Sequence, residues 1–342
     1  MRVGVNTLGL GIGYGDEEDV YIRRALACMR DAQSNTSFVL FTSPANHDSF
    51  EGWERIRVDV PDASKALARA VGAAAVDCLC TSLRAAPPDG TTPLVLYEMD
   101  VAAVVRDAGA SRWRGAGRIK RLRQLCQNAH AVVAPSRAVQ QAFLDGLDVA
   151  LDRVLVAWAG ADAVLAEPQP GFVQEPYILL VGSTDRGGNV AQTVEIIKRW
   201  EDAIPHGFVV VGRSGDEEPG DWGDRVLRLE DVPARQLGAL YQHCDLFLCP
   251  GDYSGTAVHV IEAMRAGARI VAARVGAIPE VAGRVPVYFE PGSARSMMGA
   301  IRRALEDTAE ERAECAKAAA ARAVEFTWER CGWRMLHAFR SL

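Results

Sequence analysis

Two hydroxyl side chains and one acid are spaced along residues 245–283 in a way that could serve a ligand. Ser254 and Thr256 lie two residues apart in a short polar loop, and Glu262 follows among apolar and small residues. Hydroxyls at such positions cap the free amides at the start of a helix, and that end of a helix carries a positive partial charge. The stretch therefore offers N–H groups and a positive dipole end, which suit an anionic ligand.

A strand and a helix are expected to position these residues. The apolar run 245–249 is typical of a buried strand, and Pro250-Gly251 ends it. A helix is predicted to begin near Thr256 and to end at Gly267. Glu262 then lies inside the helix, two turns from its start.

The same alternation of apolar runs and helical stretches continues through the chain. In the first half the predicted strands are residues 2–8, 37–42, 55–60, 76–80, 94–97, 130–134 and 154–157. In the second half they are residues 177–181, 208–211, 226–229, 246–249 and 269–272. A proline-rich stretch at 163–176 loses this pattern and reads as a linker. Strands that alternate with helices form parallel sheets covered on both faces, so two Rossmann-like α/β domains are predicted.

Length and composition agree with two globular domains. The chain has 342 residues, with 49% hydrophobic and 24% charged residues, and a chain of this length usually divides its core. No apolar run approaches 18 residues and no signal peptide is recognised, so a cytoplasmic protein is expected. The eight cysteines show neither a CxxC nor a Cys/His spacing, which argues against a metal site. A net charge of −6 argues against a nucleic-acid binder.

A dinucleotide-binding enzyme is disfavoured by the glycine pattern near the N-terminus. The turn that precedes a predicted helix at 17–30 contains Gly9, Gly11 and Gly13 with one residue between neighbours. That spacing is not GxGxxG, and no acid ends the second predicted strand near Thr42.

Glu262-Ala263-Met264, followed by Gly267, resembles the donor-binding segment of the family-4 retaining glycosyltransferases. In that family a first Glu is followed, after seven residues, by a second Glu and Ala-Met; here Ser254 stands in the first position. The segments 159–162 and 278–280 resemble further parts of the family pattern.

The resemblance covers most of the chain and implies the GT-B fold. In that α/β fold two Rossmann-like domains face each other, and a C-terminal helix crosses back to the first. The implied parts are an N-terminal acceptor domain at 1–162, a linker at 163–176, a nucleotide-sugar domain at 177–326 and the returning helix at 327–342.

The resemblance also implies roles for individual residues. Glu262 would receive the ribose hydroxyls of a nucleotide, although an ion pair with Arg265 is an alternative. Asp100 would face the acceptor and, with Ser254, is the candidate catalytic residue; Met99 stands where the family often has His and is expected to pack in the core. The remaining candidate donor-binding residues are Gly13, Gly15, Arg186, Asn189, Gly255 and Thr256.

Two of these assignments involve departures from the family pattern. Gly187 and Gly188 occupy the places of a basic pair, so Arg186 is the candidate substitute. Four acids at 16–19 follow the glycine turn of Gly13 and Gly15, and they are expected to face solvent at a helix start.

Residues 112–123 hold six basic side chains and form one candidate interaction surface. Ile119, Leu122 and Leu125 would give the helix one apolar face. The basic remainder could meet anionic lipid or a polyprenyl-diphosphate acceptor, or it could simply face water.

The first hypothesis is a retaining glycosyltransferase that moves a sugar from a nucleotide-diphosphate sugar to an unidentified acceptor. It needs no metal or other cofactor and no nucleic acid, and it allows a homo- or hetero-oligomer and peripheral contact with the inner face of a membrane. The alternative is a non-catalytic GT-B partner or scaffold, because positions 99, 187, 188 and 254 all depart from the family pattern.

Overall fold

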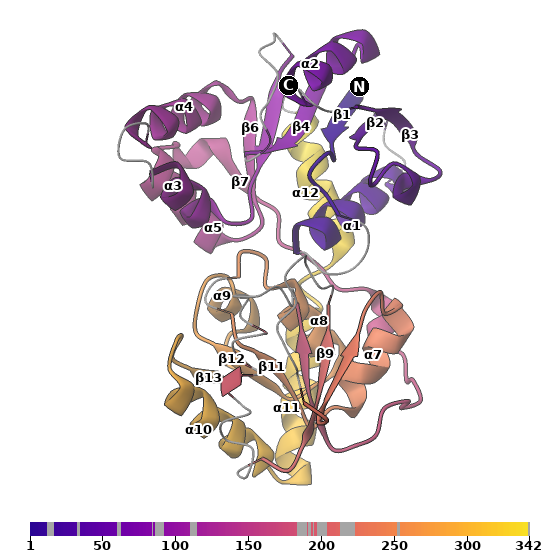
Figure 1. Ribbon diagram of the computed structural model, residues 1–342, viewed down its shortest axis with the longest axis vertical. Helices are drawn as coiled ribbons and strands as arrows, with labels where there is room; N and C mark the ends of the chain where they lie inside the picture. The colour runs from indigo at the N-terminus through magenta and orange to yellow at the C-terminus, as the bar shows by residue number, and fades with distance from the viewer. Residues whose placement is uncertain are drawn as a thin grey trace. The chain divides into compact units, whose positions relative to one another are not determined.

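The computed structural model describes residues 1–11, 17–32, 35–59, 63–83, 85, 92–109, 115–182, 190, 193, 195–196, 204–212, 223–251 and 254–340. It divides into two compact units (Figure 1). Unit 1 comprises Met1–Ile12, Ile22–Trp158 and Glu329–Leu342, and unit 2 comprises Gly13–Tyr21 and Ala159–Trp328. The first turn of one N-terminal helix therefore belongs to unit 2, although the rest of that helix belongs to unit 1.

Unit 1 is built on a parallel sheet whose described strands are ordered β3-β2-β1-β4-β5-β6-β7. The strands are β1 (Arg2–Asn6), β2 (Ser37–Thr42), β3 (Glu54–Arg57), β4 (Cys78–Ser82), β5 (Leu94–Tyr97), β6 (Ala131–Ala134) and β7 (Val154–Val156). The central strand β1 pairs with β2 on one side and with β4 on the other. Both faces of such a strand are covered, and its Val3 and Val5 are fully buried.

The helices of unit 1 follow these strands in the order that parallel pairing requires. They are α1 (Glu17–Asp31), α2 (Ala63–Ala74), α3 (Val101–Gly109), α4 (Gly115–Asn128), α5 (Arg137–Leu147) and α12 (Trp328–Arg340), with short 3-10 turns η1 (Asp48–Phe50) and η2 (Leu151–Arg153). Helix α5 shows how the sequence sets an end, because Ser136 Oγ accepts a hydrogen bond from the Val139 amide.

Helix α12 packs on elements of unit 1 that lie far from it in the sequence. Phe339 is fully buried and meets Phe38 edge to face, with ring centroids 6.4 Å apart. Gly332 allows close approach to α1, since a Cβ there would lie 3.1 Å from Cys28 Cβ. The C-terminal helix thus crosses back to the first domain, as the GT-B fold implies.

Unit 2 contains a second parallel sheet with the described order β10-β9-β8-β11-β12-β13. Its strands are β8 (Tyr177–Val181), β9 (Gly207–Val211), β10 (Val226–Leu229), β11 (Leu246–Cys249), β12 (Ile270–Ala273) and β13 (Val287–Phe289). Its described helices include η3 (Ala163–Ala166), α7 (Ala234–His243), α8 (Val258–Ala266), α9 (Ile278–Ala282), α10 (Ala294–Leu305) and α11 (Ala309–Ala323).

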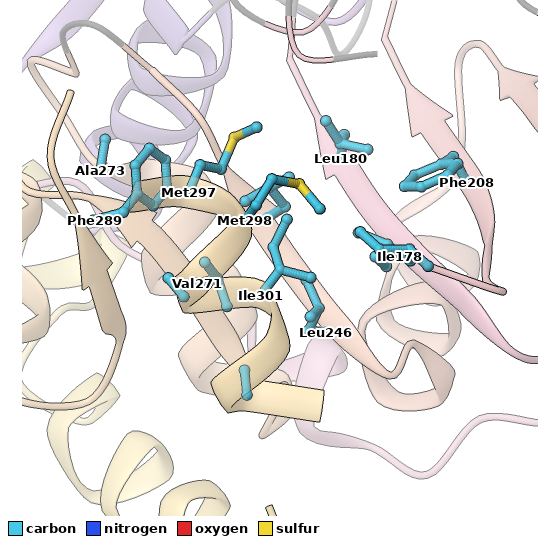
Figure 2. Close-up of a cluster of buried hydrophobic side chains, with 14 of the residues drawn as sticks. Ile178, Leu180, Phe208, Leu246, Val271, Ala273, Phe289, Met297, Met298 and Ile301 are labelled. Carbon is cyan, nitrogen blue, oxygen red and sulfur yellow. The ribbon is translucent and has the colours of Figure 1, made fainter. Parts of the chain in front are cut away.

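The core of unit 2 lies between this sheet and α10 (Figure 2). Met297, Met298 and Ile301 project from one side of α10 toward Ile178 and Leu246 of the sheet, and all five are buried. Position 301 is four residues after 297 and three after 298, which places it on the same helix face as both methionines. This packing fixes the strand β11, and with it the loop that carries the candidate site.

The predicted strands are found, with ends shifted by up to three residues. Residues 37–42, 94–97, 177–181, 226–229 and 246–249 match β2, β5, β8, β10 and β11 as predicted. Strand β13 was not predicted, because its three residues lie between Pro286 and Pro291 and look like a loop. The predicted helix after Thr256 begins at Val258 and ends before Gly267, whose φ of 78° closes it as a left-handed cap.

Candidate functional site

The loop between β11 and α8 is capped by its own hydroxyls. Ser254 Oγ accepts a hydrogen bond from the Ala257 amide at 2.9 Å, and Thr256 Oγ1 accepts one from the Val258 amide at 3.1 Å. Both residues are buried. The predicted capping by Ser254 and Thr256 is confirmed.

A glycine on the following loop holds Ser254 in place. The Ala277 amide donates to the Ser254 carbonyl at 2.8 Å. Gly276 has a φ of +56°, and a Cβ there would lie only 2.3 Å from the Ser254 carbonyl oxygen. Only a residue without a side chain permits this approach of two backbones.

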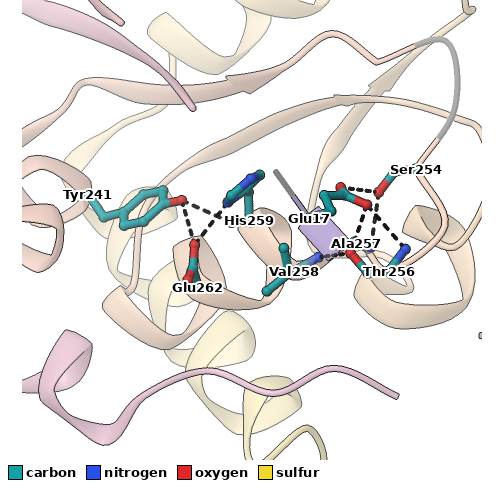
Figure 3. A network of polar contacts seen from close by, with 8 residues as sticks. All are labelled: Glu17, Tyr241, Ser254, Thr256, Ala257, Val258, His259 and Glu262. Carbon is teal, nitrogen blue, oxygen red and sulfur yellow. Dashed lines mark hydrogen bonds and ion pairs between the residues drawn. The ribbon is translucent and has the colours of Figure 1, made fainter. Parts of the chain in front are cut away.

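A carboxylate occupies the capped end of α8 (Figure 3). Ser254 Oγ donates to Glu17 Oε1 at 2.8 Å, and Thr256 Oγ1 donates to Glu17 Oε2 at 2.8 Å. The Thr256 amide reaches the same Oε2 at 3.4 Å. The anion expected at this helix end is therefore present, and it is a side chain of the protein itself.

The solvent-facing position predicted for the acids at 16–19 does not hold for the three described ones, and Asp16 lies outside the described residues. Glu17 and Glu18 are half-buried, and Asp19 is only 3% exposed. Sequence reasoning missed the Glu17 contact because its partners lie more than 230 residues away. The run of acids was a visible signal, but nothing in it indicated a partner.

Glu262 is buried inside α8 and hydrogen-bonded on one oxygen (Figure 3). The Tyr241 hydroxyl, from α7, donates to Glu262 Oε2 at 3.3 Å, and His259 Nδ1 lies 3.0 Å from the same oxygen. Burial, reinforced by the negative charge of Glu262, raises the pKa of Tyr241 well above its ordinary value, so the phenol stays a donor. Among the residues that the structure describes, no ion pair joins Glu262 to Arg265.

Asp100 lies in unit 1 at the start of α3. Its Oδ1 accepts a hydrogen bond from the Ala103 amide at 2.8 Å, which is an N-cap contact. The neighbouring Glu98 is buried, and its Oε1 accepts from the Met99 and Asp100 amides. Met99 is 7% exposed, in line with its predicted core packing.

Of the other candidate donor-binding residues, only some lie within the described part of the chain. Gly13, Gly15, Arg186 and Asn189, together with the glycine pair at 187–188, lie outside the described residues. Gly255 lies in the capped loop between Ser254 and Thr256. Within the described ranges, no group of three or more His, Cys, Asp or Glu side chains could hold a metal ion.

Helix α4 carries the described part of the basic stretch, residues 115–123. Its cationic side chains are exposed: Arg118, Lys120, Arg121 and Arg123. Ile119 and Leu122 are half-buried, and α3 and α5 pack beside the helix. None of the helices in the described part of the chain is both long and apolar enough to cross a membrane.

Comparisons with known proteins agree with the fold. Residues 175–307 match the family model described as Glycosyl transferases group 1, and these residues include the whole β11–α8 segment. The O-antigen chain mannosyltransferase B of Escherichia coli is 25% identical over 176 residues, which cover 48% of this chain and 46% of that protein. The serotype-specific mannosyltransferase WbdA of Escherichia coli is 31% identical over 241 residues, covering 63% and 29%. The chain thus spans less than half the length of these curated relatives.

Solved structures match over nearly the full length. The sucrose-phosphate synthase from Thermosynechococcus elongatus has a TM-score of 0.78 at 18% identity, covering 99% of this chain and 98% of the other. Anabaena Alr3699/HepE, in complex with UDP and glucose, has a TM-score of 0.76 at 16% identity and covers 100% of both chains. WaaG, a glycosyltransferase involved in lipopolysaccharide biosynthesis, has a TM-score of 0.76 at 13% identity, covering 97% and 98%.

Proposed function

We propose that this chain, a GT-B protein whose residues 175–307 form a glycosyl transferases group 1 domain, transfers a sugar from a nucleotide-diphosphate sugar to an acceptor. The observation that carries the proposal is the buried Glu262 carboxylate, which Tyr241 and His259 hold within the first turns of α8. Burying an acid in an otherwise apolar or small helix stretch costs stability, so an acid kept there is a candidate for a functional role. Binding the two hydroxyls of a nucleotide ribose is a role that suits a carboxylate.

In the proposed reaction the sugar is transferred with retention of configuration. The bond from the anomeric carbon to the diphosphate breaks, the acceptor oxygen bonds to that carbon on the same face, and the acceptor proton passes to the departing phosphate. Stabilising the leaving diphosphate is then the main task of the protein. We assign this task to Gly13, Gly15, Arg186 and Asn189 on the basis of the family resemblance, without a metal ion.

The acceptor side of the proposal rests on unit 1. Asp100 would face the acceptor, and its cap contact with Ala103 fixes the orientation of its carboxylate. The exposed cations of α4 would attract an anionic acceptor or anionic lipid, which brings the protein to the inner face of a membrane.

A non-catalytic role is the second candidate function. It is favoured by the Glu17 carboxylate at the end of α8, where a negatively charged ligand was expected to bind. In this reading the protein keeps the GT-B scaffold and assembles with another protein.

Calorimetric titration tests the proposal. We expect UDP or GDP, and their sugars, to bind with micromolar dissociation constants and without dependence on Mg²⁺. Glu262→Gln keeps the shape of the side chain but removes its charge, and it should weaken nucleotide binding at least tenfold, as the loss of a charged hydrogen bond predicts.

Glu290→Gln is the matched control, because Glu290 is an exposed acid of the same unit. It should leave binding unchanged. Failure of the wild-type protein to bind any nucleotide would favour the non-catalytic role, and equal binding by Glu262→Gln would remove Glu262 from the site.

A further inference from the structure

The hydroxyl protons of Ser254 and Thr256 are both donated to Glu17. A hydroxyl has one proton to donate. That of Ser254 goes to Glu17 Oε1, while its oxygen accepts from the Ala257 amide. That of Thr256 goes to Glu17 Oε2, while its oxygen accepts from the Val258 amide. Neither Ser254 nor Thr256 therefore has a side-chain proton left for a ligand.

What the loop presents instead is the Glu17 carboxylate. A carboxylate has about four acceptor positions, and three are used by Ser254 Oγ, Thr256 Oγ1 and the Thr256 amide. Glu17 is only half-buried, so the group is not sealed inside the protein. The end of α8 thus offers a hydrogen-bond acceptor rather than a set of donors.

Glu17 is held by neutral donors and not by a cation. In the part of the chain that the structure describes, no Arg, Lys or His forms an ion pair with Glu17; its partners are two hydroxyls and one amide. Among the described residues, therefore, no positive side chain cancels its negative charge. Such a group attracts the hydroxyl protons of a neutral sugar and repels a sugar that carries its own acid.

We propose that Glu17 is a specificity residue of the donor site: its carboxylate accepts one hydroxyl proton of the transferred sugar and selects neutral hexoses over acidic sugars. This inference rests on the proposed function. It gives a physical reason for Ser254, because an acid at position 254 would meet the Glu17 carboxylate, whereas a serine hydroxyl holds it in place. The acid that is absent at position 254 is supplied from residue 17.

The experiment compares nucleotide with nucleotide sugar. Calorimetric titrations use UDP, UDP-glucose and UDP-glucuronic acid, or GDP and GDP-mannose if the protein prefers guanine. The wild-type protein should bind the neutral nucleotide sugar about tenfold more tightly than the nucleotide alone, and more tightly than the acidic one. Glu17→Gln should lose this gain and the preference for the neutral sugar, while its affinity for the nucleotide alone stays the same.

Glu18→Gln is the control, because it removes the same charge one residue further along α1 while the Ser254 and Thr256 hydroxyls still donate to Glu17. It should keep the gain. A reciprocal pair adds a rescue: Ser254→Glu alone should weaken sugar binding, and Ser254→Glu combined with Glu17→Gln should restore it.

The outcomes separate the inference from the proposed function. Nucleotide binding by the wild-type protein with an unchanged sugar gain in Glu17→Gln overturns the inference and keeps the function. Tighter binding of UDP itself by Glu17→Gln also overturns it, since Glu17 would then be blocking an anion site. No nucleotide binding by the wild-type protein overturns the proposed function and, with it, the inference.

Discussion

Two fully buried thiols of unit 1, those of Cys78 and Cys126, make the free energy of unfolding depend on pH in the alkaline range. Burial raises the pKa of Cys78 and of Cys126 from 9.0 to about 12, with smaller contributions from the negative charges of Asp77 and Glu98 respectively. In the unfolded chain these thiols ionise near pH 9, so above pH 9 the unfolded state releases protons that the folded state keeps. The two thiols therefore do not reduce the free energy of unfolding below pH 9, and they reduce it increasingly as the pH rises from 9 toward 12.

We expect each thiol to lower the free energy of unfolding by about 1.4 kcal/mol at pH 10 relative to pH 8. Urea unfolding at the two pH values measures the fall. Cys126→Ala should reduce the fall by that amount, whatever its effect at pH 8. Cys315→Ala, at a half-buried position in unit 2, is the comparison; if it reduces the fall equally, burial of Cys126 is not the cause.

Residues of the site differ in how far the sequence could predict them. Glu262 could be predicted, because it is an acid in an apolar helical run, and its partner His259 lies at the readable spacing of three residues. Tyr241 and Glu17 could not be predicted, because each reaches the site from another helix through tertiary packing. The cap contact of Asp100 could have been predicted, because an acid directly before a helical pattern is typical of an N-cap, and the contact is present.

At the scale of elements, the position of the β11–α8 loop depends on one glycine. Gly276→Ala would place a Cβ against the Ser254 carbonyl and would force a positive φ on a residue with a side chain. We expect a loss of stability of about 2 to 4 kcal/mol and weaker nucleotide binding, because the cap of α8 moves with Ser254. Thermal unfolding and calorimetry measure the two effects.

Gly299→Ala on α10 is the control, because a side chain at this position would meet no neighbouring atom. No atom lies within 4 Å of a Cβ at this position, and alanine favours helix over glycine by about 1 kcal/mol. This variant should be as stable as the wild-type protein or more stable, with unchanged nucleotide binding. A Gly276→Ala protein that behaves like Gly299→Ala would contradict the steric argument.

The elements themselves were largely predictable, for a physical reason. Strands buried on both faces, such as β8 with its sequence YILLV, are continuous apolar runs and stand out from the amphipathic helices around them. Short edge strands carry less of this signal. Strand β13 has only three residues with two prolines nearby, and it is recognised from its pairing with β12 in the structure.

At the scale of the whole molecule, unit 1 depends on the last helix of the chain. Phe339→Ala would remove a fully buried ring that packs on Phe38 of β2, at a cost of about 3 to 5 kcal/mol. Hydrogen exchange should show faster exchange in β1 and β2 but unchanged exchange in β8 of unit 2.

Trp333→Ala is the control on the same helix, because Trp333 is 53% exposed. Its replacement should change stability by less than about 0.5 kcal/mol. Faster exchange in β8 after Phe339→Ala would mean that the two units unfold as one cooperative body.

The return of α12 to unit 1 also sets an order of events during synthesis. Unit 1 is encoded up to Trp158 and then completed by Glu329–Leu342, after unit 2 has been made. At a translation rate of about 5 to 20 residues per second, the surface that α12 covers waits roughly 10 to 35 s for its partner. During that interval the ring of Phe38 in the nascent first domain lacks its contact with Phe339 of α12. A ribosome-associated chaperone that covers this apolar surface would have to act within the same roughly 10 to 35 s.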